Sequence, residues 1–121
     1  MLIGLGGSVG ALLRFLTASW IQRAIPSAFP LATLTVNLLG CLLFGVVVGL
    51  AEVHRLLTPE QRLFVLVGVL GSFTTFSTFA FEAVALAESS ALGKALLYVA
   101  LHVTVGCLAI WIGAAAVRLV S

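Results

Sequence analysis

The stretch from Gly68 to Glu82 combines residue types that a helix merely crossing a membrane does not need. It holds two glycines, five hydroxyl side chains and four phenylalanines within a long apolar segment. Glycine lowers the cost of leaving helical geometry. Hydroxyl groups can satisfy backbone groups freed by a break, or donate hydrogen bonds to a bound guest. Because broken backbone at membrane depth is tolerated only under cover of protein or water, the stretch predicts a functional site.

One helical face of this stretch carries hydroxyl, aromatic and acidic side chains together, namely Thr75, Thr78, Phe79 and Glu82. Phe76 and Phe79 are neighbours on that helix, and an aromatic ring has a positive edge. Paired ring edges can therefore face an anion without trapping it as a full positive charge would, while Ser77 and Thr78 supply donors that replace water. The alternative is an aromatic core stripe with backbone-bonded hydroxyls, and a Glu82 that simply reaches the membrane interface.

Two further polar residues lie deep in apolar segments. Arg14 stands about mid-way along the first segment, where a charge usually faces protein or water. The alternative is that its long stem reaches the interface. Asn37 is the one amide of the second segment and shares a face with Thr33 and Phe44. It is interpreted either as an interhelical hydrogen-bonding group or as a donor to a desolvated anion.

The composition is that of a chain dissolved in lipid. Hydrophobic residues make up 62% of the 121 residues and charged residues 8%, whereas soluble domains carry roughly a quarter charged residues. The cysteines, Cys41 and Cys107, are expected to fill the core, and His102 is interpreted as a hydrogen-bonded packing residue. Since the sequence lacks a recognisable nucleophile–base, paired-carboxylate or metal-ligand pattern, it does not predict an enzyme.

Four segments are long enough to cross a bilayer, which takes about 20 helical residues: 2–24, 31–51, 60–88 and 95–117. The predicted fold is therefore an all-α integral membrane protein, one four-helix domain over residues 1–121, with its third helix broken near the middle. Trp20, Tyr98 and Trp111 fall near predicted span ends, where such rings prefer the interface. Thr58 followed by Pro59 predicts a capping box at the start of the third span.

Glycine spacing predicts how the helices pack, and the distribution of basic residues bears on how the chain is oriented in the membrane. Gly6 with Gly10, and Gly45 with Gly49, predict close helix contacts. The basic residues near span ends divide between Arg55, Arg62 and Arg118 on one side and Arg23 and Lys94 on the other. That bias is too small to set one orientation under the positive-inside rule, so insertion both ways and an antiparallel dimer are a hypothesis.

Three motifs in order resemble the Fluc/CrcB fluoride channel family, and the resemblance covers most of the chain. They are the glycine-rich Gly6–Arg14, Thr35–Gly40 around the asparagine, and Thr74–Phe79 with its two phenylalanines. The resemblance implies a multi-pass cell-membrane protein that forms an antiparallel, dual-topology homodimer with two anion pores. Fluoride would leave the cytoplasm through these pores passively.

The resemblance also assigns residues. It implies that Phe76 and Phe79 line the pore and that Asn37 donates to the ion. The other matching pathway positions are Thr75, Ser77, Thr78, the carboxylate Glu82 and the basic vestibule residue Arg14.

A sodium ion at the dimer centre is expected from the same resemblance, held by backbone carbonyls of Gly71 and Thr74 from both subunits. Ser72 stands where the family often has a second glycine, and Phe15 where it often has a tyrosine. Ser72 adds a Cβ at the expected break, which puts the local dihedral angles in question.

Two other functions compete. A small multidrug-type exporter has a similar size and span number but needs an acidic residue deep in the membrane for proton exchange. This chain has Arg14 in the first span, and its candidate acid, Glu82, lies off centre. A structural subunit of a larger complex would carry no ion flux of its own.

Overall fold

The computed structural model describes residues 1–53 and 57–120, and every regular element in those ranges is helical. Arg55, one of the basic residues near the span ends, lies outside the described residues. The elements in chain order are α1 (Leu2–Ala24), α2 (Leu31–Val53), α3 (Pro59–Arg62), the π-helical segment η1 (Leu63–Leu70), α4 (Gly71–Phe73), α5 (Phe76–Glu88), α6 (Leu92–Ala100), the π-helical segment η2 (Leu101–Val105) and α7 (Gly106–Leu119). The all-α prediction is confirmed.

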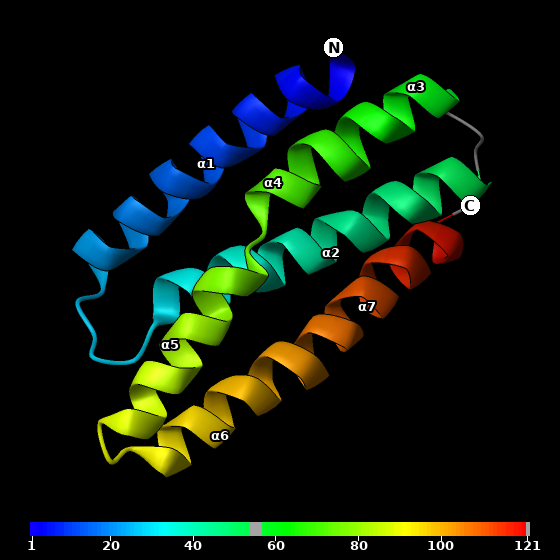
Figure 1. The fold of residues 1–121 in the computed structure, drawn as a ribbon. Helices are drawn as coiled ribbons and strands as arrows, with labels where there is room; N and C mark the ends of the chain where they lie inside the picture. Colours follow the sequence, from blue (N-terminus) through cyan, green and yellow to red (C-terminus); the bar gives the residue numbers. More distant parts are fainter. Residues whose placement is uncertain (54–56, 121) are drawn as a thin grey trace.

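Among the described residues, four helical stretches have the length and apolarity to cross a membrane. They run over Leu2–Ala24, Leu31–Val53, Pro59–Glu88 and Leu92–Leu119. Figure 1 shows them side by side, with the amino terminus, the start of α3 and the end of α7 all toward one end of the molecule. The alternating direction follows from the short connections between consecutive spans.

The third span begins at a capping box. The Thr58 hydroxyl accepts from the Gln61 N–H at 3.3 Å, and the Gln61 side chain accepts from the Thr58 N–H at 2.9 Å. Pro59 occupies the first helical position, where a missing N–H loses nothing. The predicted cap is confirmed, and it sets where this span starts.

Extended backbone separates α4 from α5. Thr74 has φ −80° and ψ 161°, and Thr75 has φ −147° and ψ 115°. Figure 1 shows the chain stepping sideways here before α5 resumes. The Thr75 side chain then caps α5 by accepting from the Thr78 N–H at 3.3 Å. This step exposes backbone groups in the middle of a span.

Glycines allow two pairs of helical segments to approach closely, and the first pair is α1 with η1. A Cβ on Gly6 would lie 2.7 Å from the Phe64 carbonyl oxygen, and one on Gly10 would overlap the Val69 carbonyl. The second pair is α2 with α7, where Gly45 meets the backbone of Ile110. Backbone contact of this kind is how membrane helices pack without a hydrophobic driving force, and the predicted small-residue faces are confirmed.

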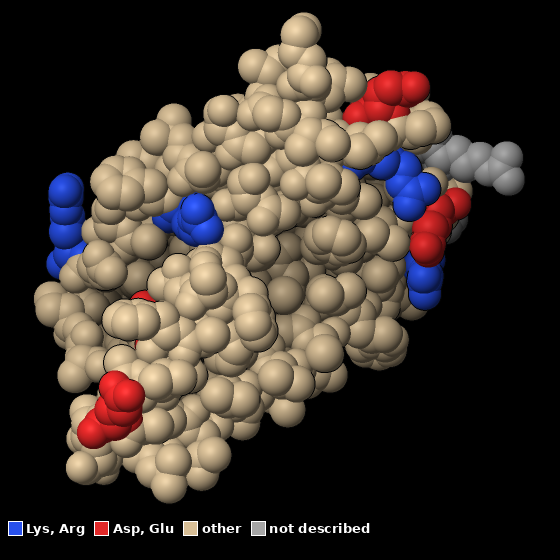
Figure 2. Space-filling model, in the orientation of Figure 1, with Lys and Arg blue, Asp and Glu red and all other residues tan. Residues whose placement is uncertain are grey.

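The outer surface is apolar, and charge collects at the ends. Figure 2 shows acidic and basic side chains mostly at the two ends of the molecule, with a broad uncharged surface between. Trp20 and Trp111 are exposed, but Tyr98 has none of its surface exposed, so the expectation of an interfacial Tyr98 is wrong. Its hydroxyl finds a partner inside the helix bundle. Cys107 is also exposed rather than core-filling, because its side of α7 faces outward.

Candidate functional site

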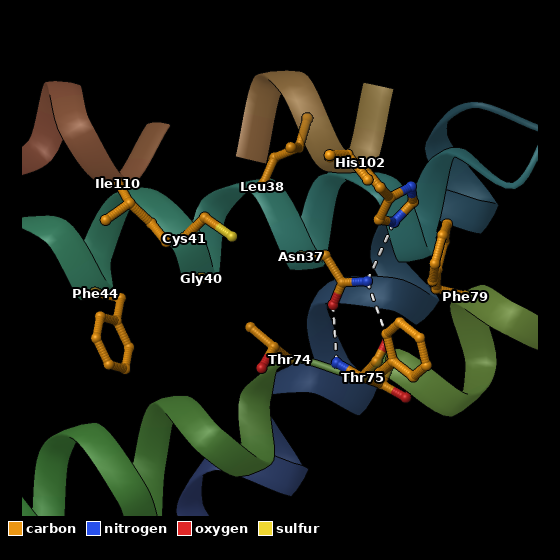
Figure 3. Close-up of a pocket in the computed structure, with 12 residues that line it drawn as sticks. Asn37, Leu38, Gly40, Cys41, Phe44, Thr74, Thr75, Phe79, His102 and Ile110 are labelled. Atoms are coloured by element: carbon orange, nitrogen blue, oxygen red, sulfur yellow. Dashed lines mark hydrogen bonds between the residues drawn. The ribbon is translucent and has the colours of Figure 1, made fainter. Parts of the chain in front are cut away.

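A pocket of about 350 Å³ lies beside the step in the third span. Its polar wall comes from Asn37 on α2, Thr74 and Thr75 at the step, and His102 on η2. Phe76 and Phe79 from α5 add aromatic walls. Figure 3 shows the Asn37 amide between the Thr75 backbone and the His102 ring. Four separate elements therefore meet at one small hollow.

Asn37 stabilises the non-helical step by hydrogen-bonding both backbone groups of Thr75. Its Nδ2 donates to the Thr75 carbonyl at 3.0 Å, and its Oδ1 accepts from the Thr75 N–H at 2.8 Å. In a continuous helix that N–H would bond the Gly71 carbonyl. A buried amide thus replaces the missing helical bond, which is what broken backbone at membrane depth requires.

His102 accepts a hydrogen bond from the second N–H of the Asn37 amide. Its Nε2 lies 3.2 Å from Asn37 Nδ2, and its Nδ1 lies 3.0 Å from the Tyr98 carbonyl. Since a carbonyl only accepts, Nδ1 carries the proton and a neutral Nε2 accepts from the amide. Both N–H bonds of the Asn37 side chain are engaged, so the interhelical interpretation of Asn37 holds in this structure.

The aromatic rings continue from the pocket toward Glu82. Phe76 and Phe79 have ring centroids 5.5 Å apart with a tilt of 56°. Phe79 also lies 4.3 Å from the His102 ring and 5.5 Å from that of Tyr98. Phe76 is 79% exposed, whereas Phe79 is half-buried. Phe79 is thus the ring that borders the interior, and Phe76 borders the surface.

Glu82 is bound by two hydroxyl groups at the far side of these rings. Tyr98 donates to its Oε2 at 2.6 Å and Thr33 donates to its Oε1 at 2.9 Å. Glu82 also lines a second pocket of about 430 Å³ beneath the α1–α2 connection, together with Phe29. Tyr98 stands between the two pockets, because its ring contacts both Phe29 and Phe79.

Ser77 and Thr78 lie on the exposed start of α5, outside both pockets. The Thr75 hydroxyl donates to that of Thr78 at 2.9 Å and lies 3.5 Å from that of Ser77. Within one chain the structure therefore gathers Asn37, Thr75 and Phe79 with Phe76, while Ser77 and Thr78 form a neighbouring hydroxyl cluster.

Arg14 and Gly71 border the step from the α1 side. Arg14 is half-buried, and its Nη1 donates to the Thr74 carbonyl at 3.4 Å. The Gly71 carbonyl has lost the Thr75 N–H to Asn37, as described above. Freed carbonyl oxygens are ligands that hard cations accept. Gly71 is exposed, whereas Thr74 is half-buried.

Sequence reasoning missed His102, Tyr98 and Thr33 as parts of the polar network. A usable signal existed, because Tyr98 and His102 are four residues apart and so share a helical face. Each was interpreted alone, one as an interfacial ring and one as a packing residue. Thr33 was placed on the Asn37 face without a partner.

The arrangement suits transient contact with a small polar guest. Among the described residues there is no group of three side chains able to hold a metal ion. The carboxylate and the imidazole are both engaged by neutral donors or acceptors. Ring edges, an amide and hydroxyls can exchange with an anion's hydration shell at low cost.

Comparison with known proteins agrees with this chemistry. The model of the family described as "CrcB-like protein, Camphor Resistance (CrcB)" matches residues 1–114. A protein of Nitratidesulfovibrio vulgaris (strain Miyazaki F) is 43% identical over 99% of the chain and 97% of its own length. One from Pseudomonas fluorescens is 45% identical over 97% and 94%, and one from Thermus thermophilus is 42% identical over 93% and 88%. All three are named fluoride-specific ion channel FluC.

Proposed function

Because the chain belongs to the CrcB-like protein family, we propose that it is a fluoride-selective channel that exports fluoride passively from the cytoplasm. The family is one of ion channels, not enzymes, and the chain is a multi-pass protein of the cell membrane. Passive exit protects a cell because hydrogen fluoride crosses lipid as a neutral acid and ionises inside. An inside-negative potential then favours exit of the anion by about 2.3 kcal/mol per 100 mV.

The observation that carries this proposal is the line of rings and neutral donors between the two pockets. Phe79 is in contact with His102 at the first pocket and with Tyr98 next to Glu82 at the second. A permanent positive charge along such a line would hold an anion too tightly, whereas ring edges and hydroxyls allow entry and release. In this proposal the anion passes Asn37, Thr75, Phe76 and Phe79.

The remaining pathway residues take supporting roles. Ser77 and Thr78 supply hydroxyl donors at the start of α5, Glu82 orients the Tyr98 and Thr33 hydroxyls, and Arg14 attracts anions toward the step. For Asn37 to donate to fluoride, one of its two N–H bonds must be given up. The bond to His102 is the one that can open, because the bonds to Thr75 hold the step.

An antiparallel dual-topology dimer with two pores completes the proposal. Phe76 is 79% exposed although it borders the pocket, so a second chain would cover the open side of the pathway. The small bias in basic residues between the two sides is consistent with insertion both ways. Labelling of each terminus in cells is expected to find it on both faces. A terminus confined to one face would remove the dual-topology part of the proposal.

A structural sodium ion between the subunits fits the step chemically. Gly71 and Thr74 of each chain would hold it through their carbonyl oxygens, and the ion would balance carbonyl dipoles that meet there. It would replace the 3.4 Å contact that Arg14 makes to Thr74. Exchange of sodium for N-methylglucamine is expected to lower the dimer fraction in chromatography. An unchanged fraction would count against the ion.

The multidrug-type exporter is the weaker alternative. Its mechanism needs a membrane carboxylate that releases a proton and binds a cationic drug. Both oxygens of Glu82 already accept hydroxyl hydrogen bonds, and Arg14 is a permanent cation in the first span. Drug-stimulated proton movement without fluoride current would favour that alternative.

The decisive test is fluoride efflux from liposomes that contain this protein alone. We expect efflux that requires a potassium ionophore for charge balance. Phe79→Ile should suppress it by about tenfold or more while the protein stays folded, since an aliphatic side chain of similar size has no positive edge. Near-normal efflux in Phe79→Ile would remove the pore assignment, and no efflux in the unmodified protein would remove the function.

A further inference from the structure

We propose that His102 is a proton-linked anion ligand, which forms a two-donor site for fluoride with Asn37 when its imidazole is protonated. The inference rests on the proposed channel function and names a regulator of the same pathway. In the neutral state described above, the Asn37–His102 hydrogen bond is closed. The pocket then offers no free amide N–H from Asn37.

Protonation of His102 turns its Nε2 from a hydrogen-bond acceptor into a donor. Nδ1–H keeps donating to the Tyr98 carbonyl, and Nε2 gains a hydrogen that points at the Asn37 amino group. Asn37 cannot rotate its amide to offer Oδ1 to the new Nε2–H, because its Oδ1 must accept from the Thr75 N–H at 2.8 Å. Two donors then face each other, and only an acceptor placed between them restores both bonds.

An anion is the acceptor that satisfies this pair best. Hydrogen bonds between charged partners are roughly twice as strong as neutral ones. The proton comes from water, or from hydrogen fluoride, whose H–F bond breaks as the new N–H bond forms and leaves the fluoride beside both donors. When the imidazole returns its proton to water, the Asn37–His102 bond closes and the anion is released.

Two features of the local structure concern this ring, its place in a π-helical turn and its contact with an aromatic ring. His102 belongs to the π-helical turn η2, and such turns occur often at functional sites. Its ring lies 4.3 Å from that of Phe79 with a tilt of 36°. Stacked this closely, an imidazolium is attracted by the ring's negative face. The pathway thereby gains a cation that exists only while a proton is bound.

The other titratable and charged groups around His102 are few. Tyr98 from α6 touches it edge-on at 4.4 Å and connects it to the Glu82 carboxylate of α5. Cys41 from α2 lines the same pocket. On the neighbouring elements α7 and α1, Cys107 is exposed and Arg14 is turned to the Thr74 carbonyl. Of these, His102 is the group whose ordinary titration range spans physiological pH.

The direct experiment follows the His102 imidazole by 15N NMR of the intact protein in detergent or nanodiscs, with His102→Gln identifying its signals. At a fixed pH near 6.5, sodium fluoride is expected to increase the protonated fraction of His102, and sodium gluconate is not. Linkage requires this, since a ligand that prefers the protonated form must raise its population. An imidazole unaffected by fluoride would overturn the proposal.

The functional experiment measures fluoride current in planar bilayers, where neutral hydrogen fluoride carries no charge. Acidification from about pH 7.5 to about pH 5.5 should lower the half-saturating fluoride concentration about fivefold or more. His102→Gln should remove this shift, because glutamine does not titrate. Glu88→Gln, an exposed residue at the end of α5, should keep it.

These outcomes separate the two claims. A current with the same pH profile in His102→Gln would overturn the His102 proposal and leave the channel function intact. Absence of fluoride current at every pH would overturn the channel function, and the imidazole experiment would still decide whether His102 binds the anion. If His102→Gln does not fold, the fluoride response of the unmodified protein decides alone.

Discussion

The two halves of α2 make contacts of opposite kinds. Toward its carboxyl end, Gly45 and Gly49 bring the backbone of α7 against that of α2. Toward its amino end, Thr33 and Asn37 contact α5 and the step through hydrogen bonds of 2.8 to 3.0 Å. The contact of Gly45 and Gly49 with α7, the glycine seam, has no room for a side chain. The contact of Thr33 and Asn37 with α5 and the step, the polar seam, instead requires particular polar atoms. Rigid glycine packing therefore anchors the polar half, where we propose that exchange with an ion takes place.

The glycine seam should be the most sensitive to added volume. A Cβ at Gly45 would overlap the Ile110 carbonyl, and backbone cannot move aside as a side chain can. Gly45→Val is expected to destabilise the fold by about 3 kcal/mol or more, measured by thermal unfolding and chromatographic dispersity. Gly4→Ala is the matched control, since nothing lies within 4 Å of its added Cβ. Equal behaviour of the two variants would contradict the difference between the seams.

The polar seam should lose transport before it loses the fold. Asn37→Ala leaves both backbone groups of Thr75 unpaired, at a cost of about 1–3 kcal/mol for each group, and should suppress fluoride efflux strongly. Asn37→Asp keeps an acceptor for the Thr75 N–H but places a negative charge on the pathway. We expect that variant to fold and still not conduct. Fluoride efflux from Asn37→Asp at the normal rate would show that the amide donors are dispensable.

The contact with Glu82 should have a smaller effect. Tyr98→Phe removes the 2.6 Å bond to Glu82 but retains the ring between Phe29 and Phe79. Since Thr33 still binds the other oxygen, we expect a loss of about 1 kcal/mol in stability and a several-fold drop in efflux. Thr33→Val tests the other bond. Tyr98→Phe with unchanged efflux would separate Glu82 from the pathway.

The smallest effect should come from the charged end of the bundle. Arg118 and Glu52 form an ion pair of 3.0 Å, with about half of each side chain exposed. Exposed pairs of this kind contribute roughly 0–1 kcal/mol. Arg118→Gln should leave both the melting temperature and the efflux within error of the unmodified protein. A marked loss would show that this end takes part in the assembly or in the pathway.

Much of the fold could be predicted from particular residues. The uncharged run of residues 31–51 predicts a span because lipid offers no partner for charge, and Thr58 with Gln61 predicts where the third span begins. The polar network could be predicted only in part. Asn37 and Glu82 stood out as polar residues in apolar runs, but their partners lie on spans more than 15 residues away in sequence.

What the sequence determined by itself is the solvent, the helical class and the chemical kinds present at the step, because lipid selects composition and period directly. Only the tertiary structure decided that the Asn37 amide is hydrogen-bonded to His102 and that the Tyr98 hydroxyl points inward and donates to Glu82. Those choices depend on how far one helix is shifted and rotated against another. That placement comes from the fit of whole helix surfaces, which no single stretch of residues encodes.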